Sequence, residues 1–188
     1  MMKRDECLRV LARHVTDEIV VATYQAAFDW LVIRPSPLNY VSIGAMGIAS
    51  SHGLGLALGR PDKRVLVLDG DGSLLMNLGS LVSVVEAAPR NFIHFVCENG
   101  TYEANGAHPI PGRDRLSFTG FAKAAGYERC HEFSEFADFE AEIAAVLREE
   151  GPVFVDLKIV PGEPSPQDYE YIHSAAARAA FKSALRGS

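Results

Sequence analysis

The sequence contains few cysteines, and their spacing matches no common cysteine-based site. Cys7, Cys97 and Cys130 form an odd, widely separated set without a C-x-x-C pair. A disulfide framework requires paired cysteines, and zinc or iron–sulfur sites require closely spaced ones, so the sequence argues against all three. Cys97 ends the apolar run 92–97, and we predict that it is a small buried hydrophobic residue.

The sequence also lacks an excess of basic residues and a long apolar stretch. Its 18 Lys and Arg face 24 Asp and Glu, which gives a formal net charge of −6 at pH 7. Nucleic acids and anionic membranes attract clustered positive charge, so we expect neither as a partner. No apolar run approaches the roughly 20 residues that span a bilayer, and no secretory signal is visible at the N-terminus. We therefore expect a cytoplasmic protein.

The chain does contain a regular alternation of apolar runs and helical patterns. Strands are predicted over 19–22, 63–68, 92–96 and 152–159, and helices over 8–17, 44–58, 74–88, 118–125 and 136–149. Apolar strands separated by helices at this spacing predict a mainly parallel sheet with helices on both faces. The expected fold is therefore a three-layer α/β/α fold.

The length of 188 residues suits one domain of ordinary size. We assign residues 1–160 to this domain. Residues 161–188 form a C-terminal tail that begins rich in proline and glycine and ends in an alanine-rich helix. We expect this tail to pack against the domain or against a partner.

A glycine-rich acidic turn, 69–73, follows one of the predicted strands. Gly70 and Gly72 let the backbone turn sharply and bring its N–H groups close to a ligand. The helix that begins immediately afterwards favours an anion, and Asp71 adds a hard carboxylate. This combination suits a magnesium–diphosphate complex, because Mg²⁺ prefers six oxygens shared between protein, phosphates and water.

Three other interpretations of this region can be compared with that one. A calcium-binding loop counted from Asp69 fails, because its sixth and twelfth positions hold Leu74 and Ser80. A dinucleotide fingerprint in 53–59 has its third glycine one place late and precedes a strand instead of following one. An ordinary turn without a ligand remains open as long as the turn is considered alone.

A second polar segment, 98–102, follows the next predicted strand. The carboxyl ends of parallel strands meet at one edge of a sheet, so this segment should lie near the acidic turn. Asn99 offers an amide oxygen and Thr101 a backbone carbonyl. Together with Asp71 they make a plausible three-oxygen contribution to one octahedral ion.

The arrangement of Gly70-Asp71-Gly72 and Asn99, separated by residues 73–98, is similar to the signature of thiamine diphosphate enzymes. The segments 44–51, 66–81 and 120–127 resemble the diphosphate-binding domains of sulfopyruvate and phosphonopyruvate decarboxylases. The similarity extends from about the first helix to Ile159. It implies the thiamine diphosphate-binding fold, with thiamine diphosphate and Mg²⁺ as cofactors.

The resemblance also implies which residues bind the cofactors. Asp71, Asn99 and the carbonyl of Thr101 would be the magnesium ligands, while backbone N–H groups of Gly72 and Ser73 would hold the diphosphate. Met46 would support the cofactor in its bent form, with core packing as its alternative role. The whole cofactor-binding set is Gly44, Ala45, Met46, Gly70, Asp71, Gly72, Ser73, Asn99, Thr101 and Tyr102.

Substrate contacts are less well defined by the sequence. His52 and His108 are candidates for meeting a carboxylate or moving a proton, and packing or loop histidines are the alternative. Arg113 and Arg115 are equally consistent with binding an anionic group and with solvated loop charges. The segment 104–108 departs from the Ser/Thr-Gly-Gly-Gln loop of the decarboxylases, so the resemblance does not identify the substrate.

The resemblance implies a two-domain active site, of which this chain has room for one domain. A separate subunit would supply the pyrimidine-binding domain and the glutamate that activates the cofactor. The chain would then be the diphosphate- and magnesium-binding subunit of a two-chain 2-oxo acid decarboxylase. The alternatives are an acetolactate synthase-like carboligase subunit, a 2-oxo acid:ferredoxin oxidoreductase subunit, whose cluster cysteines are absent, and a non-catalytic cofactor-binding module.

Overall fold

The computed structural model describes residues 1–42, 46–161 and 165–187. Over these residues it contains a seven-stranded sheet in the order β1-β9-β5-β4-β2-β3, with β8 also paired to β9. The strands of this sheet are β1 (Met2–Lys3), β2 (Ile19–Thr23), β3 (Asn39–Ser42), β4 (Val65–Gly70), β5 (Phe92–Glu98), β8 (Arg129–Phe133) and β9 (Val153–Val160). Every pairing within it is parallel, so the predicted parallel sheet is confirmed.

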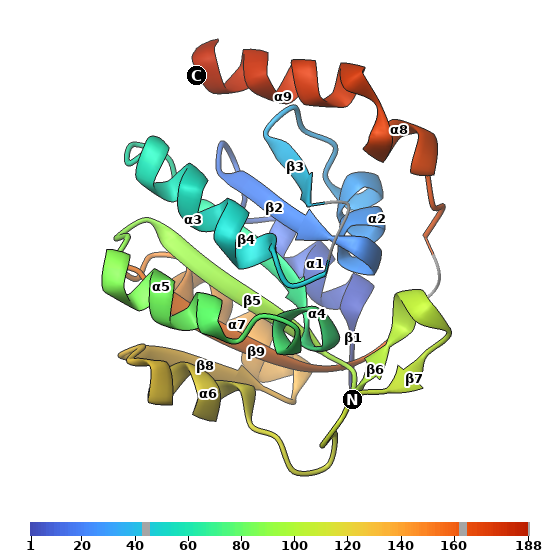
Figure 1. Cartoon of the computed structure of the whole chain (residues 1–188), viewed down its shortest axis with the longest axis vertical. Coiled ribbons are helices and arrows are strands. Elements are labelled where there is room, and N and C mark those ends of the chain that lie inside the picture. The colour runs from blue at the N-terminus through green and yellow to red at the C-terminus, as the bar shows by residue number, and fades with distance from the viewer. Residues whose placement is uncertain (43–45, 162–164, 188) are drawn as a thin grey trace.

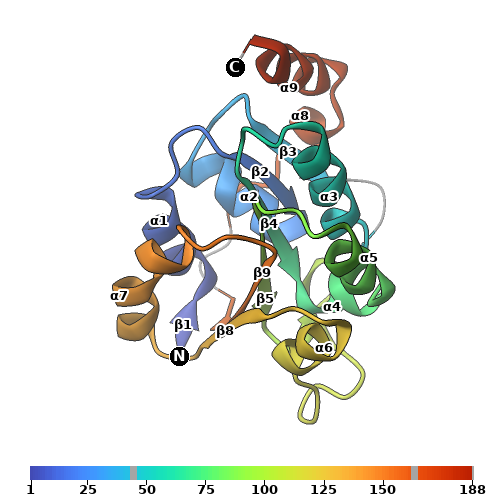
Figure 2. The ribbon, with the colours of Figure 1, turned by 90° about the vertical axis from the view of Figure 1, so that its left-hand side faces the viewer.

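Helices cover both faces of the sheet, as Figures 1 and 2 show. One face carries α1 (Arg4–Ala12), α2 (Tyr24–Ile33) and α7 (Phe136–Val146). The other carries α3 (Ala49–Gly59), α4 (Asp71–Leu75), α5 (Gly79–Ala87) and α6 (Phe118–Ala125). The predicted three-layer α/β/α architecture is therefore confirmed.

The apolar sequence of the central strand β5 matches its burial on both faces of the sheet. Ile93, Phe95 and Cys97 pack on the α1–α2–α7 side, whereas Phe92 and Val96 pack on the other. Successive side chains of a strand point to opposite faces, so a strand buried on both faces is almost continuously apolar. The exception in β5 is the buried His94, whose Nε2 lies 3.3 Å from Asp69 Oδ2. Cys97 is 4% exposed, which confirms its prediction as a buried hydrophobic residue.

Several predicted helix boundaries were wrong. The helix predicted over 74–88 is two helices, and the first, α4, already begins at Asp71. The helix predicted over 44–58 begins only at Ala49, because a turn at Gly47, with φ of +86°, precedes it. The opening helix ends at Ala12 instead of near Asp17. The helix predicted over 136–149 ends at Val146.

Some elements were missed for identifiable physical reasons. Residues 26–30 of α2 are all buried, so this helix lacks the one-sided apolar pattern that marks a surface helix. The polar edge strand β8 and the short strands β1 and β3 show no apolar alternation. The predicted polar segment 98–102 leads into an antiparallel hairpin that the sequence did not indicate, formed by β6 (Thr101–Tyr102) and β7 (His108–Pro109) around the 3₁₀ helix η1 (Glu103–Asn105).

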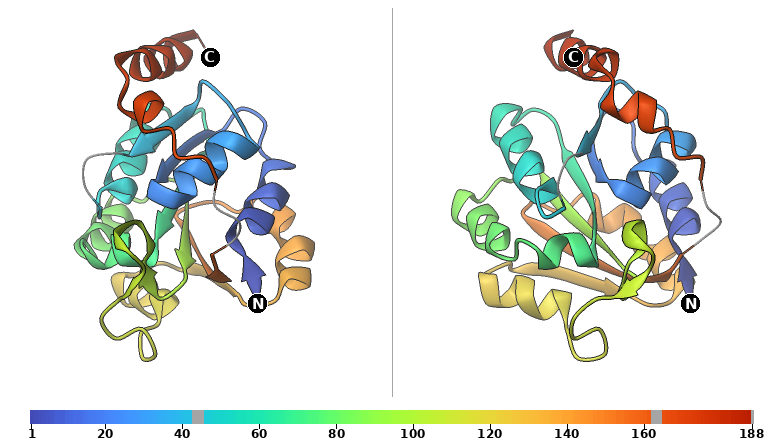
Figure 3. Two further views of the ribbon diagram at one scale, coloured as in Figure 1. Left: turned by 90° about the vertical axis from the view of Figure 1, so that its right-hand side faces the viewer. Right: turned by 45° about the vertical axis from the view of Figure 1, so that its right-hand side comes forward.

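The C-terminal tail lies on the β3 side of the sheet, as both views of Figure 3 show. It contains α8 (Tyr169–His173) and α9 (Ala175–Gly187). The ring of Phe181 lies 5.2 Å from that of Tyr40 on β3, and the ring of Tyr169 lies 5.1 Å from that of Phe28 on α2. The two aromatic contacts thus attach the tail to the edge of the sheet. Among the described helices, none is long and apolar enough to cross a membrane.

Candidate functional site

The two polar segments predicted to meet do so at the carboxyl edge of the sheet. β4 ends at Gly70, and Asp71 begins α4 directly. β5 ends at Glu98, and Asn99 and Gly100 follow, Gly100 with a φ of +72°. The side chain of Asp71 joins the two strand ends: its Oδ2 accepts hydrogen bonds from the backbone N–H of Asn99 at 3.0 Å and of Gly100 at 2.6 Å.

Asp71 is a buried carboxyl group, with 2% of its surface exposed. Burial raises its pKa to about 6, although the backbone N–H groups of Gly72, Gly100 and Asn99 favour the charged form. Its Oδ1 accepts one hydrogen bond, from the N–H of Gly72 at 2.7 Å. A carboxylate oxygen has a second lone pair, so Oδ1 retains a position for a cation.

Asn99 and Thr101 form a compact polar unit beside Asp71. Asn99 Oδ1 accepts hydrogen bonds from the backbone N–H of Thr101 at 2.8 Å and from its hydroxyl at 2.9 Å. Asn99 Nδ2 donates to Glu103 Oε2 at 2.9 Å. The amide oxygen of Asn99 therefore lies on the Thr101 side of the turn and its nitrogen on the Glu103 side.

A buried ion pair network adjoins this unit, and the sequence reasoning missed it. Arg4 Nε donates to Asp29 Oδ2 at 2.6 Å, and its Nη1 donates to Glu103 Oε2 at 2.5 Å. Burial alone would lower the pKa of Arg4, but the hydrogen bond to Glu103 and the charge of Asp29 outweigh it, so the pKa is raised. Arg4 is therefore charged, between two carboxylates.

The turn that carries Met46 is attached to α4. The backbone N–H of Gly47 donates to Ser73 Oγ at 2.9 Å, and Asn77 Nδ2 donates to the Gly47 carbonyl at 2.9 Å. A Cβ atom on Gly47 would lie 3.2 Å from Met76 Cβ, so a larger residue would crowd α4 as well as strain the backbone. These contacts fix Met46 beside the Asp71–Ser73 segment.

Gly72 was predicted to bind the diphosphate through its backbone, and in the structure it also makes room for the ring of Tyr102. A Cβ atom at Gly72 would lie 2.5 Å from Cδ1 of Tyr102, so the ring of Tyr102 occupies the space that a side chain would need. The N–H of Gly72, predicted to hold the diphosphate, donates to Asp71 here. Ser73 Oγ accepts from Gly47, which leaves its own proton free to donate to a ligand.

A pocket opens between these segments. It is lined by every described member of the predicted cofactor-binding set, namely Met46, Gly70, Asp71, Gly72, Ser73, Asn99, Thr101 and Tyr102. Gly44 and Ala45, the remaining two, lie outside the described residues. The pocket is also lined by residues that were not predicted: Arg4, Thr23, Tyr24, Gln25, Ala26, Asp69, Cys97, Glu103 and Ala104.

The segment 23–26 comprises the last residue of β2 and the first turn of α2, at the edge where β4 and β5 also end. Tyr24 has a φ of +45°, an uncommon backbone conformation for a bulky residue, at the point where β2 passes into α2. The strand at 19–22 was predicted, so the parallel-sheet rule would have placed the residues after it at this edge. Because α2 was not predicted, residues 24–26 were not recognised as the start of a helix at this edge.

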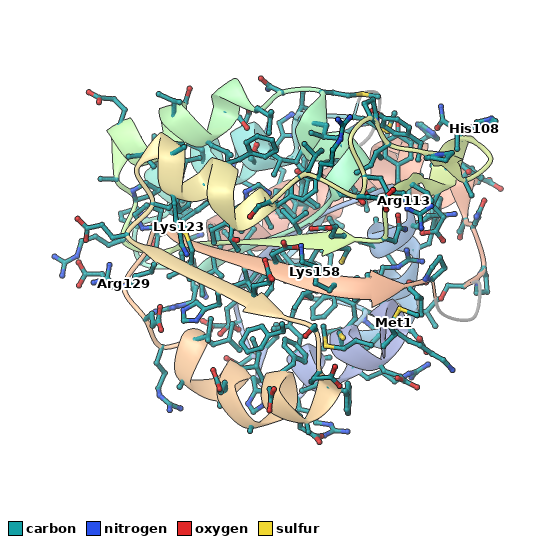
Figure 4. All side chains as sticks on the ribbon, turned by 90° about the horizontal axis from the view of Figure 1, so that it is seen from below. Met1, His108, Arg113, Lys123, Arg129 and Lys158 are labelled. Carbon is teal, nitrogen blue, oxygen red and sulfur yellow. The ribbon has the colours of Figure 1, made fainter. Side chains whose placement is uncertain are left out.

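The two histidine candidates lie apart from the pocket lining. His52 Nδ1 is 3.1 Å from Ser42 Oγ, its ring stacks edge-on against Tyr40, and burial lowers its pKa. His108 is exposed on β7, and Figure 4 shows it farther out than Arg113. The side chain of Arg113 lies against the turn after β5: a Cβ atom placed on Gly100 would be 3.0 Å from Nε of Arg113. Arg115 is exposed.

The donor groups of the pocket fit a hard cation better than a soft one. Within the described ranges, no three His, Cys, Asp or Glu side chains are grouped so that they could hold a metal ion by themselves. Asp71, Asn99 and Thr101 offer only oxygen, which suits Mg²⁺ completed by phosphate and water oxygens. The residues present thus fit a metal that arrives with a diphosphate.

Comparison with known proteins agrees with the geometry. Residues 21–157 match the family model described as the thiamine pyrophosphate enzyme, C-terminal TPP binding domain. The chain is 35% identical over 163 residues to the sulfopyruvate decarboxylase subunit beta of Methanothermobacter thermautotrophicus, a match that covers 86% of this chain and 84% of the relative.

Two further relatives are longer proteins. The phosphonopyruvate decarboxylase of Streptomyces viridochromogenes is 36% identical over 155 residues, which cover 82% of this chain and 38% of that enzyme. An X-ray structure described as a thiamin diphosphate-dependent enzyme from Mycobacterium smegmatis superposes with a TM-score of 0.71 at 22% identity. That match covers 86% of this chain and 32% of the solved one, and it shows a shared fold.

Proposed function

The chain belongs to the thiamine pyrophosphate enzyme family as a C-terminal TPP-binding domain, and from this we propose that it is the diphosphate- and magnesium-binding subunit of a two-chain 2-oxo acid decarboxylase. The observation that carries the proposal is the pocket at the carboxyl edge, where Asp71 connects the ends of β4 and β5. The similarity in length and sequence to a protein named a decarboxylase subunit beta supports the same conclusion.

In this proposal Asp71, Asn99 and the carbonyl of Thr101 hold Mg²⁺. Asp71 Oδ1 has a free lone pair, and the hydroxyl of Thr101 can rotate away from Asn99 Oδ1. The Ser73 hydroxyl and the backbone N–H groups of Gly72 and Ser73 hold the diphosphate. For Gly72, this requires that its hydrogen bond to Asp71 be shared with, or replaced by, a phosphate oxygen.

The remaining pocket residues orient the cofactor. Met46 supports its bent form. By the family resemblance, the Gly44 carbonyl would meet the pyrimidine amino group, and Ala45 would belong to the same cofactor-binding set. Gly70 and Tyr102 shape the wall beside the diphosphate. Thiamine diphosphate, when bound, supplies a nucleophilic thiazolium carbon and accepts the electrons that decarboxylation releases. The chain contributes binding, orientation and exclusion of water.

We further propose that a separate subunit covers this pocket with a pyrimidine-binding domain and its activating glutamate. Residues 1–160 would form the cofactor-binding unit, and the tail 161–188 would be a packing element at the β3 edge. His108 and Arg113 do not line the pocket, but both are exposed, and each lies next to a residue of the pocket region: His108 pairs with Tyr102, and Arg113 lies against Gly100. They are therefore our candidates for contacts to a small 2-oxo acid. His52, held by Ser42 and Tyr40, has the contacts of a packing residue.

Co-expression with a candidate pyrimidine-domain subunit tests the proposal. The purified complex should convert one or more 2-oxo acids into aldehydes when thiamine diphosphate and Mg²⁺ are present, and the chain alone should not. Efficient decarboxylation by the chain alone would refute the two-chain arrangement. An acetolactate-like acid in place of an aldehyde would identify the complex as a carboligase, and cofactor binding without turnover of any 2-oxo acid would favour a non-catalytic module.

A further inference from the structure

Arg4 is a buried charged residue that lines the pocket and has no role in the proposed function. It is 4% exposed, although it lies in the first turn of α1 near the N-terminus. Its guanidinium contacts both oxygens of Glu103, at 2.5 and 3.2 Å, and also Asp29 Oδ2 at 2.6 Å. One arginine therefore connects α1, α2 and η1 around the pocket.

Glu103 transmits this connection to Asn99. A carboxylate only accepts hydrogen bonds, so Glu103 Oε2 selects the amide nitrogen of Asn99, which donates at 2.9 Å. The amide oxygen must then lie on the opposite side, next to Thr101. Thr101 holds that oxygen through its backbone N–H and its hydroxyl. Without Glu103 the amide would be held at its oxygen end alone, and its plane would be free to tilt away from the position that presents the oxygen to Mg²⁺.

Arg4 in turn holds Glu103 in place. A bidentate arginine–carboxylate pair fixes both the position and the plane of the carboxylate, which a single point charge does not. Arg4 lies outside the segment that matches the family model, 21–157.

We propose that Arg4 is a positioning residue of the magnesium site, which acts through Glu103 to keep the Asn99 amide oxygen available to the cation. This inference rests on the proposed function. In this proposal Arg4 does not touch the cation but orients one of its ligands. Loss of such a supporting contact typically weakens metal affinity by roughly 10- to 100-fold.

A double-mutant cycle with Arg4→Met and Glu103→Ala tests the inference. Apparent Mg²⁺ affinity is measured on the full chain with its partner subunit, by titrating Mg²⁺ at fixed thiamine diphosphate and following the melting temperature. Each single variant should bind Mg²⁺ roughly 10- to 100-fold more weakly. The double variant should bind no more weakly than the worse single one, because both substitutions break the same connection.

Two further variants separate positioning from packing. Arg9→Met removes an exposed arginine of the same helix, whose nearest carboxylate, on Asp5, is 4.0 Å away, and should leave Mg²⁺ affinity unchanged. Arg4→Lys keeps the charge without the bidentate geometry and should restore part of the affinity. Glu103→Ala keeps the Arg4–Asp29 pair, so it remains informative if Arg4→Met does not fold.

The outcomes distinguish this inference from the proposed function. If the wild type shows no Mg²⁺-dependent response to thiamine diphosphate, both are refuted. If the wild type responds and the Glu103 variant binds Mg²⁺ as tightly as the wild type, only the positioning role is refuted. Losses of affinity that add in the double variant would also refute it, because they would show that Arg4 and Glu103 act separately.

Discussion

Replacing Asp71 with asparagine should separate the stability of the protein from its affinity for the cofactor. Burial raises the pKa of this carboxyl group from 3.8 to about 6. At about 1.4 kcal/mol per unit, charging this group in the folded, cofactor-free protein costs on the order of 3 kcal/mol. An asparagine removes that cost but keeps the shape of the side chain.

The substitution also loses hydrogen bonds, which limits the gain. Asp71 accepts one backbone N–H through Oδ1 and two through Oδ2. Asparagine has a single oxygen, and if this faces Asn99 and Gly100, the N–H of Gly72 loses its acceptor. A buried unsatisfied donor costs about 1–3 kcal/mol, so the net change in the free energy of unfolding should lie between about zero and +2 kcal/mol.

Thermal unfolding with and without cofactor measures both effects. Since about 1 kcal/mol shifts the melting temperature of a domain of this size by 2–4 °C, the cofactor-free variant should melt at the wild-type temperature or a few degrees above it. Thiamine diphosphate with Mg²⁺ at a hundred times its dissociation constant should stabilise the wild type by about 2.7 kcal/mol and the Asp71→Asn variant by almost nothing.

A matched control is available in another buried carboxyl group. Asp156 on β9 is fully buried and lines no part of the pocket, so Asp156→Asn should retain the response to cofactor. If Asp71→Asn still responds to Mg²⁺ and thiamine diphosphate, then Asp71 is not a metal ligand. If instead the cofactor-free variant melts well below the wild type, the hydrogen bonds of the carboxylate outweigh its burial, and the electrostatic reasoning is wrong.

Three further predictions concern packing, turnover and pH. On α3, Gly53→Ala should destabilise the fold by about 1–3 kcal/mol, because the new Cβ would overlap the side chain of Val67. Gly55→Ala should stabilise the fold by about 0.5–1 kcal/mol, because no atom lies within 4 Å of the new Cβ. Denaturant unfolding measures both changes. Met46→Ala should lower kcat of the complex more than it weakens cofactor binding, and the reverse pattern would contradict its supporting role. Burial, together with the nearby charge of Glu98, raises the pKa of Asp156 to about 8. The folded state therefore holds this proton more tightly than the unfolded state, so the free energy of unfolding should fall as pH rises from about 4 to 8. Asp156→Asn should flatten that slope, and an unchanged slope would assign it to other groups.

The part of the site that could be predicted from the sequence depends on two local features. Asp71 and Asn99 each follow an apolar strand directly, and neighbouring parallel strands end at one edge, so their proximity follows from the order of the elements. The exact start of α4 could not be predicted in this way. The glycines on either side of Asp71 favour a loop, but β4 continues to Gly70 and the helix begins one residue later.

The remaining part depends on contacts that leave no local pattern. Arg4 is 25 positions from Asp29 and 99 positions from Glu103, and neither carboxylate stands in a motif with it. In the sequence Arg4 belongs to the polar residues of an opening helix, for which an exposed position is the ordinary expectation. Only the packing of α1 against α2 and η1 buries it and makes the two acidic partners necessary.

The proposed metal ligand Asn99 therefore depends on residues that the family signature does not include. Under the proposal, Asp71 and Asn99 of the family signature supply oxygens to the cation. The Asn99 amide is also held by Glu103, which Arg4 contacts, and both of these residues lie outside the signature. A chain with Asp71 and Asn99 intact but without this pair would still match the signature and still fold its sheet. Its asparagine amide would, however, be held only through its oxygen, by Thr101, and its nitrogen would have no acceptor. We therefore expect the affinity for Mg²⁺ to vary among such chains with the residues at positions 4 and 103, even where the signature itself is identical.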